Sequence, residues 1–186
     1  MKDELRKRIN EDTFRYFGEE KRSGLYRLGV QALQYTIVLR KVQYHSEHRN
    51  RIRYLRYKTE LSVLSRCYFI QIPASTRIGR GLYIGHMGSV VVNEHAVLGD
   101  NVNLSVGVTI GQTNRGPMKG SPTLGNSVWV GTNAVLVGGI TVGNNVLIAP
   151  NAYCNIDVPS DSIVIGNPAT ITRNERATDG YVQNQV

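Results

Sequence analysis

The chain has 186 residues, of which 41% are hydrophobic and 19% charged, with a formal net charge of +8. This composition is that of a globular protein with one domain and a small extension, and it argues against a disordered, collagen-like or membrane-spanning chain. The charged N-terminus leads into no apolar run typical of a signal peptide. The cysteines, Cys67 and Cys154, are too far apart in the sequence to suggest a disulfide framework or a zinc site. We therefore expect a cytoplasmic protein without a bound metal.

The excess of positive charge lies in the N-terminal part of the chain. Residues 1–70 hold 16 of the 22 Lys and Arg residues and 8 of the 14 Asp and Glu residues of the chain. Residues 71–186 hold the remaining six basic and six acidic residues. Apolar residues at alternating three- and four-residue spacings between Leu25 and Val42 predict two or three amphipathic helices. We therefore expect a basic α-helical region over residues 1–70.

The densest basic cluster lies between Arg49 and Lys58, where arginines and lysine alternate with two tyrosines. Such a cluster is most often a solvated helix face, and secondly a surface for an anionic partner. A membrane surface is one such partner, so contact with it through the basic helices stays open. We do not expect nucleic acid as a partner.

A six-residue repeat dominates the chain from residue 71 onward. An aliphatic residue, or once a cysteine, returns every six positions, and glycine often follows it. The repeat positions are Ile72, Ile78, Ile84, Val92, Leu98, Leu104, Ile110, Leu124, Val130, Leu136, Val142, Ile148 and Cys154. A period of six fits neither a helix nor a long strand. It predicts short strands joined by tight corners and stacked into a parallel β-helix, with the aliphatic residues inside. The small residue after each of them is expected to relieve crowding at the corner, and glycine there to tolerate positive φ.

The repeat is interrupted twice, between Ile84 and Val92 and between Ile110 and Leu124. The first interruption contains His86. The second contains residues 112–123, whose Gly, Pro and basic residues cannot continue the coil and are expected to project. We therefore expect a β-helix domain over residues 71–172 with a projecting loop at 112–123, and a C-terminal tail over residues 173–186. Since exceptions to a repeat often mark function, His86 is a candidate catalytic residue.

Residues 78–94 around His86, and the ending Gly166-Asn167-Pro168-Ala169, resemble the serine O-acetyltransferase family. Hexapeptides of this kind also resemble those of the hexapeptide-repeat acyltransferases. The resemblance covers about residues 70–172. It implies a mainly β fold, a left-handed parallel β-helix of hexapeptide repeats with a small N-terminal α-helical region. It also implies a homotrimer with active sites between neighbours and acetyl-CoA as co-substrate.

The family resemblance assigns a chemical role to His86. In that family the matching histidine is the general base, which takes the proton from an acceptor hydroxyl as the hydroxyl attacks the acetyl thioester. The chemistry needs such a group because a hydroxyl is a weak nucleophile at neutral pH, whereas an imidazole titrates near neutrality. Glu94 matches an acidic position of the family and is the candidate to orient this base.

The resemblance also implies where acetyl-CoA would bind. The positions that match the family's contacts to the pantetheine arm are Gly111, Gln112, Gly131, Thr132, Ala149 and Pro150. The nucleotide phosphates need cations, and the candidates are Arg173, Arg115 and Lys119.

Three positions depart from the family's pattern. Gln71 stands where the family has an aspartate that orients the base. Gly85 stands where it has an aspartate that helps to bind the serine amino group, and Ser121 replaces a second histidine. Since a buried ammonium group without a carboxylate partner is costly, free serine would be a poor acceptor.

We therefore expect an acetyl-CoA-dependent O-acetyltransferase that acts on a sugar hydroxyl of a surface polysaccharide or its precursor. This expectation follows the polysaccharide-biosynthesis branch of the family, which trimmed sequences of this type resemble. Two alternatives stay open: serine O-acetylation, and a non-catalytic scaffold that binds an anionic polymer.

Overall fold

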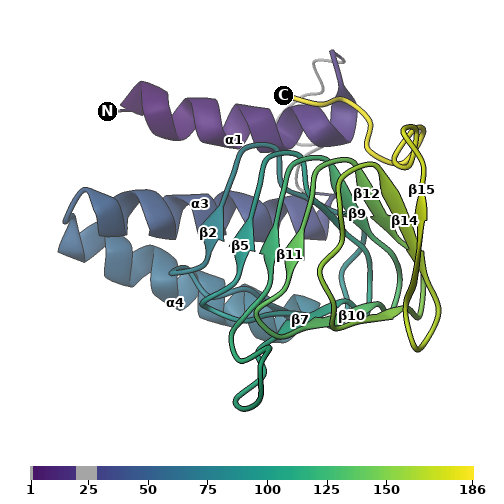
Figure 1. Ribbon diagram of the computed structural model, residues 1–186. Helices are drawn as coiled ribbons and strands as arrows, with labels where there is room; N and C mark the ends of the chain where they lie inside the picture. The colour runs from purple at the N-terminus through teal and green to yellow at the C-terminus, as the bar shows by residue number, and fades with distance from the viewer. Residues whose placement is uncertain (1, 20–28) are drawn as a thin grey trace.

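The computed structural model describes residues 2–19 and 29–186. In this part of the chain three helices, α1 (Lys2–Phe17), α3 (Gln31–Glu47) and α4 (Arg51–Tyr68), precede fifteen short strands. The strands form a three-faced coil of about five turns, and the helices lie at its N-terminal end (Figure 1). The predicted fold class, a left-handed parallel β-helix with an N-terminal α-helical region, is confirmed. None of the described helices is both long and apolar enough to span a membrane.

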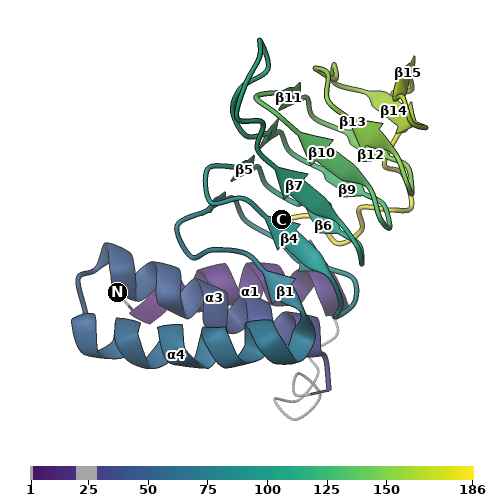
Figure 2. The ribbon, with the colours of Figure 1, turned by 90° about the horizontal axis from the view of Figure 1, so that it is seen from below.

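Each face of the coil is one sheet. The first face holds β1 (Ile70–Gln71), β4 (Val90–Val92), β7 (Thr109–Gly111), β10 (Val135–Val137) and β13 (Tyr153–Cys154) and is seen in Figure 2. The second face holds β2 (Arg77–Ile78), β5 (Val97–Leu98), β8 (Thr123–Leu124) and β11 (Thr141–Val142). The third face holds β3 (Tyr83–Ile84), β6 (Asn103–Leu104), β9 (Val128–Val130), β12 (Val146–Ile148), β14 (Ser162–Ile165) and β15 (Thr170–Arg173). All described pairings between these strands are parallel except that of β14 with β15.

The hexapeptide positions form the core of the coil. Twelve of the thirteen repeat residues are at most 2% exposed, and the remaining one, Ile78, is partly buried and packs against the same core. Burying an aliphatic side chain of this size contributes about 1.5–3 kcal/mol. The period of six therefore arises because each short strand points one aliphatic side chain into a single central column.

Of the two roles predicted for the repeat glycines, relief of crowding is confirmed at Gly99, whereas positive φ is wrong. The left-handed corner residues stand three positions after the aliphatic residue, as at Asn101 (φ 57°) and Asn133 (φ 58°), and asparagine tolerates this conformation better than most residues. The glycine next to the aliphatic residue is needed for space instead. A Cβ atom at Gly99 would lie 2.4 Å from the carbonyl oxygen of Gly125 in the next coil.

The helices complete the backbone hydrogen bonds of the first coil. The Tyr35 hydroxyl donates to the carbonyl oxygen of Ile72 at 3.1 Å and accepts from its N–H at 3.0 Å. The Tyr16 hydroxyl does the same at Ile84, with both bonds at 3.0 Å. Because an open edge of a sheet invites other strands to pair with it, these tyrosines act as a cap.

Two segments leave the coil. Residues 113 and 120 pair in an antiparallel bridge, and the loop between them projects from the body of the molecule (Figure 1). The C-terminal segment after β15 runs back over the third face toward α1, where the Tyr181 ring packs against Trp129 with centroids 4.8 Å apart. Its last residue, Val186, exchanges two hydrogen bonds with the Asn101 side chain.

Candidate active site

His86 lies on the corner between the third and the first face, here called the His86 edge. This edge comprises Gly85, His86, Ser105, Gly131, Thr132, Ala149 and Pro150. Backbone bonds stack these corners, since Gly85 N donates to the Leu104 carbonyl oxygen at 3.0 Å and Gly131 N to that of Ile148 at 2.8 Å. Neighbouring coils are about 4.8 Å apart. Five predicted site residues, His86, Gly131, Thr132, Ala149 and Pro150, therefore share one edge.

The interruption of the repeat brings the His86 side chain out of the coil. Gly88 adopts φ 133°, and its N–H donates to the carbonyl oxygen of Tyr68 at the end of α4 at 2.8 Å. His86 itself is exposed. Within the described part of the chain, its imidazole forms no hydrogen bond, ion pair or ring contact. Both ring nitrogens are thus available to a substrate.

A cavity of about 480 Å³ opens beside His86. Ser105 and Thr132 line it from the His86 edge, and Tyr83 and Trp129 from the third face. Its remaining wall comes from two distant segments, α1 and the C-terminal segment. The imidazole is therefore positioned at a cavity large enough for small reactants.

The wall residues from α1 and the C-terminal segment escaped prediction from the sequence. Arg15 of α1 and Tyr181 and Gln183 of the C-terminal segment all line the His86 cavity. They lie far from His86 in the chain, and neither segment belongs to the repeat. Their approach depends on how α1 and the C-terminal segment pack over the third face, for which the sequence carries no local signal.

The other predicted site residues lie elsewhere. The corner between the first and second faces, here called the loop edge, carries Glu94, Gly111 and Gln112, and the projecting loop adds Arg115 and Lys119. The strand β4 separates this edge from His86. Within one chain Glu94 faces His95, with 3.6 Å between Oε1 and Nε2, and does not orient His86. Its predicted role would require a neighbouring copy.

Arg173, the third phosphate candidate, is at the end of β15 and forms an ion pair with Glu175 at 3.1 Å. It pairs in register with Ser162, at the start of β14, whereas the His86 edge follows the ends of the third-face strands. Both charged side chains are largely exposed. Arg173 is therefore not part of the cavity in one chain.

The three departures from the family pattern are spread over the molecule. Gln71 is exposed on the first face. Ser121 lies near the loop edge, where its hydroxyl donates to Asn93 Oδ1 at 3.0 Å. Gly85 is adjacent to His86 and lines the cavity without offering a side chain. No group of three or more His, Cys, Asp or Glu in residues 2–19 and 29–186 could hold a metal ion.

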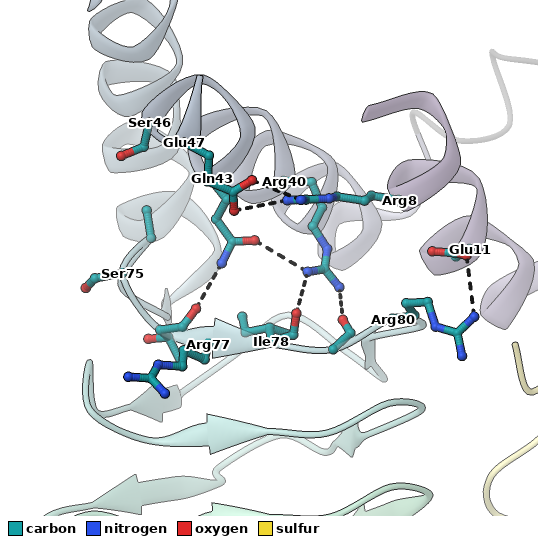
Figure 3. A pocket seen from close by; sticks show the side chains of 13 residues that line it. Arg8, Glu11, Arg40, Gln43, Ser46, Glu47, Ser75, Arg77, Ile78 and Arg80 are labelled. Atoms are coloured by element: carbon teal, nitrogen blue, oxygen red, sulfur yellow. Dashed lines mark hydrogen bonds and ion pairs between the residues drawn. The ribbon is translucent and has the colours of Figure 1, made fainter. Parts of the chain in front are cut away.

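A second cavity, of about 530 Å³, lies between α1, α3 and the first coil (Figure 3). Most of its charged side chains form ion pairs or hydrogen bonds with neighbouring groups. Arg8 contacts Glu47 at 2.9 Å, and Arg40 donates to the carbonyl oxygen of Ile78 at 3.1 Å. These contacts join the helices to the coil, so we assign this cavity a structural role.

Comparisons with known proteins connect this chain to an enzyme family. The family model "Bacterial transferase hexapeptide (six repeats)" matches residues 121–155. The serine acetyltransferase of Helicobacter pylori (strain ATCC 700392 / 26695) is 40% identical over 132 residues, which cover 70% of this chain and 76% of that protein. The serine acetyltransferase of Synechococcus elongatus is also 40% identical, over 60% of this chain and 46% of that longer protein.

Solved structures of serine acetyltransferases are also similar to this chain. The soybean serine acetyltransferase apoenzyme superimposes with a TM-score of 0.76 at 26% identity and covers 90% of this chain, which spans 69% of it. Serine acetyltransferase from Neisseria gonorrhoeae in complex with serine gives a TM-score of 0.74 at 26% identity, over 91% of this chain and 69% of that one. The serine acetyltransferase of Brucella abortus in complex with coenzyme A gives a TM-score of 0.72 at 27% identity, over 91% of this chain and 66% of that one. The chain is a hexapeptide-repeat acetyltransferase and belongs to the serine acetyltransferase family.

Proposed function

We propose that this protein transfers the acetyl group of acetyl-CoA to the hydroxyl of L-serine, with His86 as the general base. The observation that carries the proposal is the exposed imidazole of His86, without a partner in the described chain, at the mouth of the 480 Å³ cavity. Family membership supports serine as acceptor. One structural relative was solved with serine and another with coenzyme A.

The reaction needs one proton acceptor and one proton donor. A ring nitrogen of His86 takes the proton of the serine hydroxyl as its oxygen attacks the thioester carbonyl carbon, and the resulting tetrahedral intermediate then expels the thiolate. The new C–O bond replaces the C–S bond, and the imidazolium returns its proton to the thiolate. General base catalysis of this kind contributes about 10²–10⁴-fold to the rate.

The His86 edge is our proposed binding site for the pantetheine arm. From His86 the edge continues over Thr132 and Pro150 in the later coils, always with small or compact corner residues. Small corners allow an extended chain to approach backbone N–H and carbonyl groups closely. This course directs the cofactor away from α1 and leaves the α1 side of the cavity to the acceptor.

We further propose that neighbouring copies complete the site in a homotrimer. Residues matched to the cofactor site occupy both the His86 edge and the loop edge, which are separated within one chain by the first face. A cyclic assembly places one edge of each copy against the next copy. Gly111, Gln112, Arg115 and Lys119 of one copy would then reach the acetyl-CoA bound at the His86 edge of another.

The glycan acceptor expected from the sequence has weaker support than serine. The relatives reported above are serine acetyltransferases, and none supports a polysaccharide branch. One observation keeps a sugar hydroxyl as the second candidate: no Asp or Glu is among the described residues that line the His86 cavity, so a serine ammonium would lack a carboxylate partner within one chain. The scaffold alternative has no support from this family of enzymes.

An acceptor comparison tests the proposal. The protein is incubated with acetyl-CoA and either L-serine, glucose or N-acetylglucosamine, thiol release is followed, and products are identified by mass spectrometry. We expect thiol release with L-serine and a product about 42 Da heavier than serine, because an acetyl group replaces the hydrogen atom of the hydroxyl. Turnover with a sugar but not with serine would contradict L-serine as the acceptor and support a sugar hydroxyl instead.

A further inference from the structure

Arg15 forms an unusual part of the cavity wall. Its side chain comes from the last turns of α1, and the residue is only 4% exposed. Nε donates to the carbonyl oxygen of Gln183 at 3.1 Å, and Nη2 donates to Asn103 Oδ1. The third nitrogen, Nη1, is buried and has no hydrogen-bond partner among the described residues.

The charge of this guanidinium is not neutralised by a described carboxylate. Arg15 appears in no ion pair within residues 2–19 and 29–186. The nearby carboxylate of Asp12 is held by Arg40, through contacts of 2.7 and 3.0 Å. The Tyr83 ring provides a weaker contact, with its centroid 5.9 Å from Arg15 Cζ.

A buried cation in this situation is costly. A buried donor left without a partner is not compensated for its lost hydration, and this free-energy cost is larger when the donor is charged. Burial also lowers the pKa of Arg15 to about 10, with Tyr83, Tyr16 and Asp12 only partly opposing it. An anion brought into the cavity by a ligand would supply both the missing hydrogen bond and the missing charge.

We propose that Arg15 binds a carboxylate of the acceptor whose hydroxyl is deprotonated by His86. Both residues line the same cavity, and the inference rests on the function proposed above. The pantetheine arm follows the His86 edge away from α1, so the anion beside Arg15 belongs to the acceptor. A planar guanidinium matches a carboxylate in shape.

The inference defines an acceptor class, namely molecules that carry a carboxylate near the reactive hydroxyl. Free serine belongs to this class, and so does a sugar acid such as glucuronic acid. Neutral sugars do not. Gln183 and Asn184 position the arginine, because Gln183 receives the Nε bond and the Asn184 amide donates to the Arg15 carbonyl oxygen at 3.4 Å.

Paired acceptors test the role of the charge. The ratio of kcat/KM is measured for L-serine against L-serinamide, and for glucuronic acid against glucose, in wild type, Arg15→Gln and Arg15→Lys. In the pair that is turned over, we expect wild type to prefer the carboxylate by about 10- to 100-fold, the range given by a hydrogen bond between charged groups. Arg15→Gln should bring this ratio close to one, mainly through KM, and Arg15→Lys should retain part of it.

Arg77→Gln serves as the matched control, because Arg77 is exposed and lies outside the His86 cavity. It should leave the ratio unchanged. Thermal unfolding of each variant separates a folding defect from a binding defect. If Arg15→Gln does not fold, Arg15→Lys decides, since a ratio equal to that of wild type would overturn the inference.

The outcomes distinguish the two proposals. Turnover with a carboxylate preference that survives in Arg15→Gln overturns the role of Arg15 and leaves the proposed function standing. Turnover by wild type without any preference for the carboxylate-bearing acceptor also overturns the role of Arg15 and leaves the proposed function standing. Absence of turnover with all four acceptors overturns the proposed function and the inference together.

Discussion

Arg40 of α3 and Asp12 of α1 form an ion pair of 2.7 Å in which the side chains are 4% and 1% exposed. Burial raises the pKa of the Asp12 carboxyl, although Arg40 opposes the shift. The pair also reaches the coil, since Asp12 Oδ1 accepts from Leu82 N at 2.9 Å and Arg40 donates to the carbonyl oxygen of Gly79. Two helices and the first coil are therefore joined through one buried pair.

Replacing one partner of this pair should destabilise the whole protein. Asp12→Asn keeps the shape of the side chain but leaves the Arg40 charge buried without compensation, which we expect to cost about 3–5 kcal/mol. Urea denaturation gives the free energy of unfolding. Glu11→Gln is the control, because its contacts with Lys7 and Arg80 are 4.0 and 3.9 Å long, and it should cost less than about 1 kcal/mol. Equal stability of the two variants would contradict this account of the junction.

Mixed oligomers should recover activity that neither parent variant has. One parent carries His86→Gln, and the other has residues 114–119 of the projecting loop replaced by two glycines. Random assortment of the chains pairs an intact His86 edge with an intact loop edge at roughly a quarter of the sites of a cyclic assembly. Thiol release by the co-refolded mixture measures this recovery. A mixture no more active than its separate parents would show that sites are not shared.

The buried charge of Arg15 predicts a dependence of stability on pH. Burial lowers its pKa from the ordinary value of an arginine to about 10. Above about pH 10 the unfolded chain therefore holds a proton that the folded protein has lost, and linkage then favours the folded state as the pH rises. Between about pH 7 and 9, we expect a constant difference in the free energy of unfolding between wild type and Arg15→Met. Above about pH 10, wild type should gain stability relative to this variant. Urea denaturation of both proteins across this range gives the difference, and a difference that stays constant up to about pH 11 would show that Arg15 is not desolvated.

The sequence predicted the coil because its signal is local. Each hexapeptide carries its own inward residue, so a period of six could be read without knowing which coils are neighbours. His86 was identified as a candidate in the same way, from an interruption of a regular pattern. The loop at 112–123 followed from residues that cannot form a coil strand, and the structure shows it projecting.

Other features depend on contacts between distant segments and had no such signal. For the glycine after each aliphatic residue, the predicted positive φ was wrong. The predicted relief of crowding is confirmed at Gly99, which Gly125 of the next coil approaches closely. Arg15 belonged to a region predicted only to be basic and helical. Its place beside His86 results from the packing of α1 and the C-terminal segment on the third face.

The most direct test of the account is the rate of acetyl transfer by His86→Gln. We expect its kcat with L-serine to fall by about 10²–10⁴-fold, because glutamine cannot take the proton of the hydroxyl. Calorimetry should give an unchanged Kd for coenzyme A, and the thermal midpoint should match that of wild type because the side chain is exposed. A variant that turns over within threefold of the wild-type rate would contradict the assignment of His86 as the base.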